Sequence, residues 1–323
     1  MVHSQLLSAA PAWLPGGNLQ TLWAATLARR PQPPALQRER WDTPDGDFID
    51  VDLALARAGA PTLVLFHGLE GSSASHYAQA FAAQAAARSW SVVLPHFRGC
   101  SGDLNRAPRA YPSGDLHEVA WILARLRQRL GVPLLAVGVS LGGNALLRWA
   151  GEVGAEAAAQ VAAVAAVSSP LDLAAAGAAI DRGFNRQVYA RLFLSTMKPK
   201  ALRKWQQHPG LFDRDRVRAA RTIYAFDDAF TAPLHGFAGT DDYWARASAK
   251  PHLGRIRVPA LALNARNDPF VPAASLPRAA DAGPFVTLWQ PPQGGHVGFP
   301  AGHFPGHVRR MPAAVCDWFD SVA

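Results

Sequence analysis

Three residue types that together activate a hydroxyl group occur in this sequence in an order that fits nucleophilic catalysis. Ser140 lies in Gly138-Val139-Ser140-Leu141-Gly142, between a short apolar stretch and a stretch with helical spacing. A serine hydroxyl is a poor nucleophile until a neighbouring base takes its proton and a carboxylate orients that base. A turn between a strand and a helix presents such a serine, and the two glycines allow the turn and the helix to approach closely. The pattern therefore predicts Ser140 as a nucleophile.

The predicted base and acid lie later in the chain, each just past a predicted strand. Asp268 lies in Asn264-Ala265-Arg266-Asn267-Asp268-Pro269-Phe270, and His296 lies in Gly294-Gly295-His296-Val297-Gly298-Phe299. Open α/β sheets place their ligands at the carboxyl ends of the strands, so we expect both side chains at the edge that carries Ser140. The order serine, acid, histidine along the chain is the one that this arrangement uses.

Other carboxylates are alternative acids. They are Asp172, Asp242 and Asp281. Asp268 fits better, because it follows the strand immediately before the one that leads to His296.

The remaining histidines suggest structural roles. His303 and His307 are four residues apart, but Pro305 lies between them and no carboxylate is suitably spaced, so we predict no metal site. His67 and His96 end buried strands, where a structural role is the better interpretation.

Attack on an ester carbonyl also creates an oxyanion, which needs hydrogen-bond donors. One donor in this arrangement is the amide that follows the nucleophile, here that of Leu141. The other comes from the loop after the third strand, here His67-Gly68-Leu69, and we predict the Leu69 amide. Gly68 lets that backbone approach the site.

Strand and helix patterns alternate around these motifs. Apolar or alternating runs predict strands over residues 39–43, 47–53, 62–67, 91–95, 132–137, 161–167, 258–264 and 285–289. Helices are expected up to residue 87, from about 115 to 130, after Ser140, and from about 306 to 321. This alternation predicts an α/β class, with a mostly parallel central sheet and helices on both faces. A Gly-x-Ser-x-Gly turn between a strand and a helix is typical of the α/β-hydrolase fold, so we expect that fold, with a helical cap inserted after the sixth strand.

The same reading predicts the domain organisation. Residues 1–39 are a proline-punctuated arm, expected to pack on the body. Residues 40–169 and 251–323 form the core, and residues 170–250, which show no clear strand, form the cap.

Composition limits the classes of partner. The 323 residues carry 32 basic and 24 acidic side chains, a net charge of +8, but no nucleic-acid-binding motif accompanies this charge, so we expect no nucleic-acid partner. No run of about 18 apolar residues and no signal-peptide pattern occurs, so we expect a cytoplasmic protein with at most peripheral membrane contact. Cys100 and Cys316 do not suggest a disulfide framework.

Two groups of cap residues have two interpretations each. The aromatic group could form an acyl pocket or the cap's own core, and we expect most of it in the core and a few members facing the site: Phe184, Tyr189, Phe193, Trp205, Phe212 and Phe230. The basic group could attract an anionic head group or form a solvated helix face, which we favour: Lys198, Lys200, Arg203 and Lys204.

Several separated motifs give the chain a family resemblance. They are Gly17-Asn18-Leu19-Gln20-Thr21-Leu22, His67-Gly68-Leu69-Glu70-Gly71-Ser72, Arg98-Gly99-Cys100-Ser101-Gly102, the stretch from Gly138 to Gly143, Asp227-Asp228 with Phe230-Thr231-Ala232, Asn267-Asp268-Pro269-Phe270, and Gly295-His296-Val297-Gly298-Phe299. With these motifs the chain resembles the YheT-like branch of the α/β-hydrolase superfamily, whose relatives include esterases, lipases and acyltransferases. The resemblance implies Ser140, Asp268 and His296 as nucleophile, acid and base, and no cofactor. One departure is Asn18, where the family usually carries histidine.

These observations favour a serine hydrolase of carboxylic esters that works through an acyl-enzyme on Ser140. The expected substrates are small molecules, either short- to medium-chain acyl esters or monoacylglycerol-like lipids. One alternative is an acyltransferase that uses the same three residues with an alcohol acceptor. Another is a non-catalytic binding protein on a hydrolase scaffold. The sequence leaves the physiological substrate and the oligomeric state open.

Overall fold

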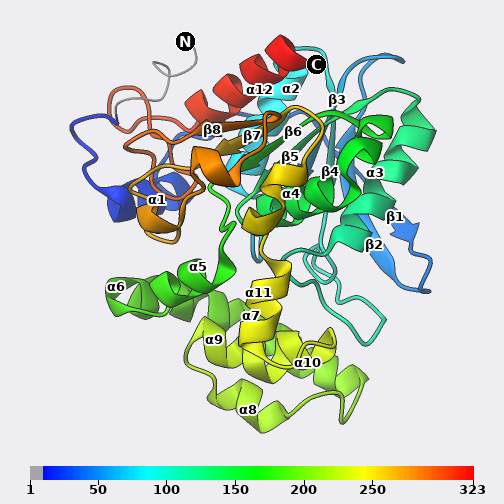
Figure 1. Cartoon of the computed structure of the whole chain (residues 1–323), viewed down its shortest axis with the longest axis vertical. Helices are drawn as coiled ribbons and strands as arrows, with labels where there is room; N and C mark the ends of the chain where they lie inside the picture. Colours follow the sequence, from blue (N-terminus) through cyan, green and yellow to red (C-terminus); the bar gives the residue numbers. More distant parts are fainter. Residues whose placement is uncertain (1–9) are drawn as a thin grey trace.

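The element that organises the fold is an eight-stranded sheet (Figure 1). The computed structural model describes residues 10–323, so residues 1–9 of the predicted arm lie outside the described residues. The strands are β1 (Gln37–Asp42), β2 (Phe48–Ala54), β3 (Thr62–Phe66), β4 (Ser91–Pro95), β5 (Leu134–Val139), β6 (Val161–Val167), β7 (Ala260–Leu263) and β8 (Val286–Trp289). All eight predicted strands are present, with their ends within two residues of the predicted ones.

The sheet is mostly parallel, as predicted. Its order is β1-β2-β4-β3-β5-β6-β7-β8. The β1–β2 hairpin and its junction with β4 are antiparallel, and the other pairs are parallel. Strands β3 and β5 lie in the middle and are buried along their whole length, which explains their continuous apolar runs. The loops after the parallel strands β3, β5, β6, β7 and β8 therefore meet at one edge.

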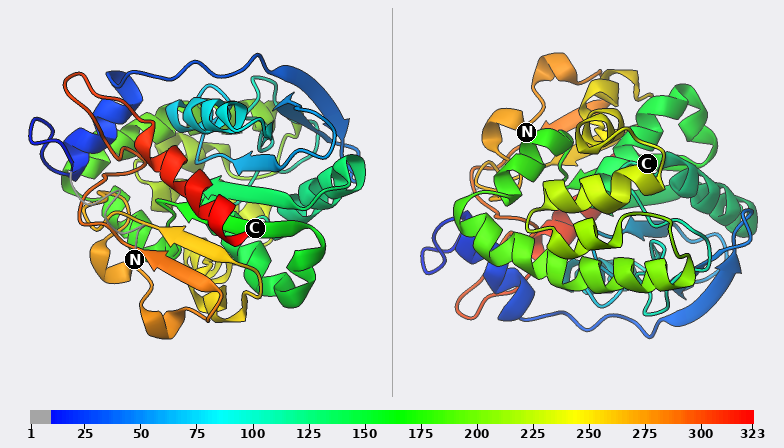
Figure 2. Two further views of the ribbon diagram at one scale, coloured as in Figure 1. Left: turned by 90° about the horizontal axis from the view of Figure 1, so that it is seen from above. Right: turned by 90° about the horizontal axis from the view of Figure 1, so that it is seen from below.

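Helices cover both faces of the sheet. On one face, α3 (Leu116–Leu130) and α4 (Leu141–Val153) pack through residues such as Ile122 and Trp149. On the other, α2 (His76–Ala87) and α12 (Arg310–Val322) pack through Phe81 and Phe319, and Figure 2 shows α12 crossing the sheet.

The last helix begins later than predicted, at Arg310 instead of about residue 306. The preceding segment is not helical, because it pairs with other backbone segments: His307 forms bridges with Arg29 of the arm and with Ala301. A segment whose amides and carbonyls are used in this way cannot join the helix.

The chain between β6 and β7 forms the cap, which lies beneath the sheet in Figure 1 and in front of it in the right-hand view of Figure 2, seen from below. Its helices are α5 (Leu173–Ile180), α6 (Gly183–Asn185), α7 (Arg191–Gln207), α8 (Arg214–Ala219), α9 (Ile223–Phe226), α10 (Ala232–Leu234) and α11 (Thr240–Ala247). The cap has an apolar cluster of its own, which includes Phe212, Phe226 and Trp244. It can therefore pack as a unit on the carboxyl edge of the sheet.

The described part of the arm packs on the body. Its helix, α1 (Gly17–Thr26), buries Trp23, which is 3% exposed and donates a hydrogen bond from Nε1 to the carbonyl of Pro305 at 2.7 Å. Leu14 and Ala24 join Trp23 in a cluster with Ala80 of α2.

Candidate active site

Ser140 lies on a strained turn at the carboxyl end of β5, directly before α4. Its backbone has φ 52° and ψ −120°, a conformation that costs free energy in a non-glycine residue. A Cβ at Gly142 would lie 2.3 Å from the carbonyl oxygen of Phe66, and one at Gly138 would lie 2.4 Å from the carbonyl oxygen of Gly142. Both glycines are therefore required by the close packing of α4 against the sheet, as the sequence predicts.

The structure brings the three candidate catalytic side chains together. His296 Nε2 lies 3.0 Å from Ser140 Oγ, and His296 Nδ1 lies 2.9 Å from Asp268 Oδ2. Asp268 follows β7 and is 5% exposed, whereas Ser140 and His296 are only partly buried.

The hydrogen bonds of the other carboxylate oxygen of Asp268 determine which nitrogen of His296 carries the proton. Oδ1 accepts hydrogen bonds from the amides of Phe270 at 2.8 Å and Val271 at 3.3 Å. Oδ2 is left to accept the Nδ1–H of His296, so Nε2 of the neutral imidazole carries a lone pair toward Ser140. This arrangement can take a proton from the serine hydroxyl.

The loop after β3 lies against the nucleophile. A Cβ at Gly68 would lie 3.1 Å from Ser140 Cβ. The Gly68 amide donates to the Tyr77 hydroxyl at 2.9 Å, and the Glu70 amide donates to the Tyr111 hydroxyl at 3.0 Å. The amide between them, that of Leu69, has no hydrogen-bond acceptor within residues 10–323.

The Leu141 amide is in the same situation at the first position of α4. It lies where an intrahelical acceptor is absent, and no other acceptor occurs in the described part of the chain. Two amides without an acceptor among the described residues thus lie in the segments next to Ser140, one in the loop after β3 and one at the start of α4; their role as oxyanion donors stays a prediction.

The alternative acids have other partners. Asp172 accepts the amide of Ala175 and caps α5, Asp242 pairs with Arg246, and Asp281 pairs with Arg278. None of these carboxylates hydrogen-bonds to His296.

Comparisons with known proteins agree with this architecture. Residues 61–302 match the family model described as the α/β hydrolase fold. The chain belongs to the α/β hydrolase family. It is 38% identical to the Escherichia coli (strain K12) protein named "Putative esterase YheT", over 87% of this chain and 83% of that protein, which confirms the YheT-like resemblance. It is 29% identical to a Mus musculus protein named Phospholipase ABHD3, over 90% of this chain and 73% of that protein.

Solved structures show the same fold. One is α/β hydrolase domain-containing protein 10 from mouse, which has a TM-score of 0.55 and 13% identity over 89% of this chain and all of that chain.

In this α/β hydrolase, Ser140 and His296 line a cavity between the sheet and the cap. The cavity encloses about 1100 Å³ not filled by atoms, including the part open to solvent. Apolar side chains form most of its wall. Of the six cap aromatics singled out in the sequence, Phe193 and Phe230 line it. Tyr189 instead packs against Phe270, with ring centroids 4.6 Å apart.

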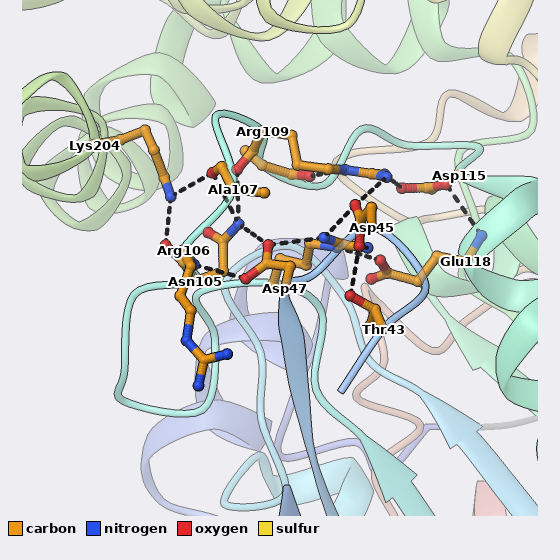
Figure 3. A network of polar contacts seen from close by, with 12 residues as sticks. Thr43, Asp45, Asp47, Asn105, Arg106, Ala107, Arg109, Asp115, Glu118 and Lys204 are labelled. Carbon is orange, nitrogen blue, oxygen red and sulfur yellow. Dashed lines mark hydrogen bonds and ion pairs between the residues drawn. The ribbon is translucent and has the colours of Figure 1, made fainter. Parts of the chain in front are cut away.

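A polar network beside the cavity connects the cap to the core (Figure 3). Lys204 of α7 donates to the carbonyls of Asn105 at 2.6 Å and Ala107 at 2.9 Å. The Asn105 side chain donates a hydrogen bond to Asp47 at 2.6 Å, and Asp47 also accepts one from Arg98 at 2.7 Å.

Lys204 is 1% exposed, so the expectation of a solvated face is wrong for this residue, and burial lowers its pKa to about 8. The carbonyls that its long side chain reaches belong to residues about 100 positions earlier in the sequence. The expectation is also wrong for Lys200, which lines the cavity and pairs with Glu70 at 2.7 Å.

The buried histidines have structural contacts. His67 Nε2 accepts a hydrogen bond from the Phe97 amide at 3.0 Å, and burial lowers the His67 pKa to about 3, so the ring is neutral. His96 Nε2 lies 2.9 Å from Asp52.

Two absences apply to residues 10–323. No three His, Cys, Asp or Glu side chains in this range are grouped to hold a metal ion. None of its helices combines the length and apolar composition that a membrane crossing requires.

Sequence reasoning assigned no role to two residues of α1 that contact the loops of the site. They are Gln20 and Thr21, which hydrogen-bond to Asn267 and to the backbone of His296. The motif that contains them is visible in the sequence, but its contacts lie about 250 residues away.

Proposed function

We propose that this protein is a serine esterase that cleaves carboxylic esters through an acyl-enzyme on Ser140. The observation that carries the proposal is the pair of hydrogen bonds, 3.0 and 2.9 Å long, that connect Ser140, His296 and Asp268 at the wall of an apolar cavity. The relatives named esterase and phospholipase support the same reaction type.

The geometry supports the following course. Ser140 Oγ attacks the ester carbonyl carbon while His296 Nε2 takes the hydroxyl proton, and Asp268 stabilises the imidazolium. The Leu69 and Leu141 amides donate to the oxyanion of the tetrahedral intermediate. Its collapse breaks the bond to the alcohol oxygen, which leaves with the proton from His296. Water, deprotonated by His296, then cleaves the acyl-enzyme by the same steps and releases the acid.

The cavity supports an apolar acyl group as the recognised part of the substrate. Its wall includes the apolar side chains of Leu69, Phe193 and Phe230. Charged side chains also line it, but they have partners in the protein, as Lys200 has in Glu70 at 2.7 Å. Short- to medium-chain acyl esters and monoacylglycerol-like lipids fit this chemistry.

The test is hydrolysis of p-nitrophenyl esters from acetate to palmitate by the wild type, Ser140→Ala and the control Ser195→Ala. Ser195 lies on the exposed side of α7, where its hydroxyl donates a hydrogen bond to the carbonyl of Leu192. We expect Ser140→Ala to lose about a thousandfold or more in kcat, whereas Ser195→Ala keeps the wild-type rate. A wild type that hydrolyses none of the series, and whose Ser140 is not labelled by a fluorophosphonate, would refute the proposal.

A further inference from the structure

Helix α1 of the arm lies directly on the two loops that carry Asp268 and His296. A Cβ at Gly17 would lie 1.8 Å from the carbonyl oxygen of Asn267, and one at Gly298 would lie 2.5 Å from that of Gln20. A Cβ at Gly295, whose φ is 60°, would lie 2.8 Å from the carbonyl oxygen of Gly17. Backbone atoms of the arm and of both loops are thus in contact, which only glycines at these positions permit.

The Gln20 side chain joins the two loops to each other. It is fully buried, and its Oε1 accepts hydrogen bonds from Asn267 Nδ2 and from the Gly294 amide, both at 3.0 Å. Its Nε2 donates to the Leu14 carbonyl at 3.0 Å and to Gln293 Oε1 at 3.2 Å. Every hydrogen-bonding position of the amide is therefore used.

Asn267 completes this connection. Its Oδ1 accepts hydrogen bonds from the amides of Gly294 and Gly295, both at 3.0 Å. The residue before Asp268 is in this way bonded to the residue before His296, and Gln20 holds the assembly from the side of the arm.

Thr21 holds His296 itself. Its Oγ1 accepts a hydrogen bond from the His296 amide at 2.8 Å and donates to the Gly17 carbonyl at 2.7 Å. The next residue, Val297, has φ 60°, which is unfavourable for a β-branched side chain, and its amide bonds to Ser168 Oγ at 3.1 Å. A strained conformation of this kind persists only where several contacts fix it.

We propose that Gln20 and Thr21 are positioning residues of the esterase: they fix the separation of Asp268 and His296 and hold His296 against Ser140. Neither side chain touches the reacting atoms. The inference rests on the proposed function, since it assumes that these three residues carry the reaction. A misplacement of about 1 Å in such a site can cost about a hundredfold in rate, so contacts that set the loop position have a kinetic consequence.

The test compares the same substitution at two threonines of α1. Thr21→Val removes the hydroxyl and nearly conserves the volume, and Thr21→Ser keeps the hydroxyl. Thr26→Val is the control, because Thr26 makes the same bond to the carbonyl four residues before it, that of Leu22 at 2.7 Å, but is exposed. With p-nitrophenyl butyrate we expect Thr21→Val to lower kcat by about 10- to 100-fold, with KM within about twofold of the wild type. Thr21→Ser should return most of the rate, and Thr26→Val should match the wild type.

A second readout follows the nucleophile directly. The rate at which a fluorophosphonate labels Ser140 should fall in Thr21→Val in parallel with kcat, because the reagent also requires proton removal by His296. Gln20→Asn, whose shorter amide cannot reach both loops, should behave like Thr21→Val. Circular dichroism and thermal unfolding identify the temperature at which all variants are folded, and the rates are compared there.

The outcomes separate the two proposals. If the wild type is active and Thr21→Val and Gln20→Asn both retain its kcat and labelling rate, the positioning role is wrong and the esterase proposal stands. A loss that appears in KM alone, or one that Thr26→Val shares, also overturns the positioning role. A wild type that neither hydrolyses esters nor reacts with the fluorophosphonate refutes the esterase proposal and, with it, this inference.

Discussion

Replacement of Asp268 by asparagine tests the direction of the hydrogen bonds at the site. In the wild type, the Phe270 and Val271 amides donate to Oδ1, and His296 Nδ1 donates to Oδ2. In Asp268→Asn the carbonyl oxygen must face the two backbone donors, which places the NH₂ group against Nδ1. The imidazole then carries its proton on Nε2 and cannot accept the proton of Ser140.

The expected fall in kcat follows from the free energy needed to turn the new side-chain amide into the orientation that would restore activity. Turning the amide so that its oxygen faces His296 would set the NH₂ group against both backbone amides. Each buried donor left unsatisfied costs about 1–3 kcal/mol, so this orientation is disfavoured by about 2–6 kcal/mol. At about 1.4 kcal/mol per tenfold change, we expect kcat to fall by between about 30-fold and 10⁴-fold, with little change in KM.

The assay is hydrolysis of p-nitrophenyl butyrate near neutral pH, with Asp172→Asn as the control. Asp172 is an alternative acid from the sequence, and its role as the N-cap of α5 is one that asparagine fills equally well. The control should keep the wild-type rate. An Asp268→Asn protein that folds normally and works within threefold of the wild type would refute the assigned polarity, and a large loss in Asp172→Asn would point to the wrong acid.

Two further predictions concern the cap. Met197 of α7 lines the cavity, so Met197→Trp should fill part of it and shift the highest kcat/KM in the p-nitrophenyl series to acyl chains shorter by about two carbons or more. The control, Leu192→Trp on the exposed side of the helix, should leave the chain-length profile unchanged. An unchanged profile in Met197→Trp would show that Met197 does not line the acyl pocket. Burial lowers the Lys204 pKa to about 8, below its usual 10.5, so between these values the unfolded chain binds more protons at this residue, and the contribution of Lys204 to the free energy of unfolding should rise by about 1–3 kcal/mol as the pH rises from about 8 to about 10.5. Burial raises the pKa of Cys100 to about 11 and that of Cys316 to about 12, which acts in the opposite direction in every variant, so the readout is the difference from the wild type. In urea unfolding, the free energy of unfolding of the wild type relative to Lys204→Met should rise over this pH range, whereas that relative to Lys198→Met should stay constant; an equal pH dependence in all three proteins would contradict the assignment.

The parts of the fold that the sequence predicts best are those with local signals. The apolar runs of β3, β5 and β6 and the glycines around Ser140 each reflect a contact or a conformation within a few residues, so their pattern is legible without the rest of the chain. Ser140, Asp268 and His296 each follow a parallel strand, and the carboxyl ends of parallel strands lie at one edge of the sheet. That rule was enough to predict the side chains that the structure brings into hydrogen-bond distance.

The parts that the sequence did not predict depend on distant partners. Lys204 looks like one of four solvated cations until the loop that supplies the carbonyls of Asn105 and Ala107 is placed beside α7. Gln20 looks like an ordinary polar residue on a short helix until the loops about 250 and 275 positions later are packed on it. A buried polar group is recognisable only through its partners, and local patterning carries no information about them.

The backbone strain of this protein is concentrated at the edge of the sheet that carries the site. Among the described residues, six non-glycine residues have positive φ, and five of them lie in loops after β3, β5, β6 and β8: Glu70, Ser140, Ser168, Val297 and Phe299. Each such residue costs about 1–3 kcal/mol, so a fold selected for stability alone would not collect them at one edge. They lie in the loops that carry Leu69, Ser140 and His296, three residues that line the cavity. The contacts of α1 with the loop at Val297 offset this strain, because they stabilise a loop conformation that the loop's own residues do not favour.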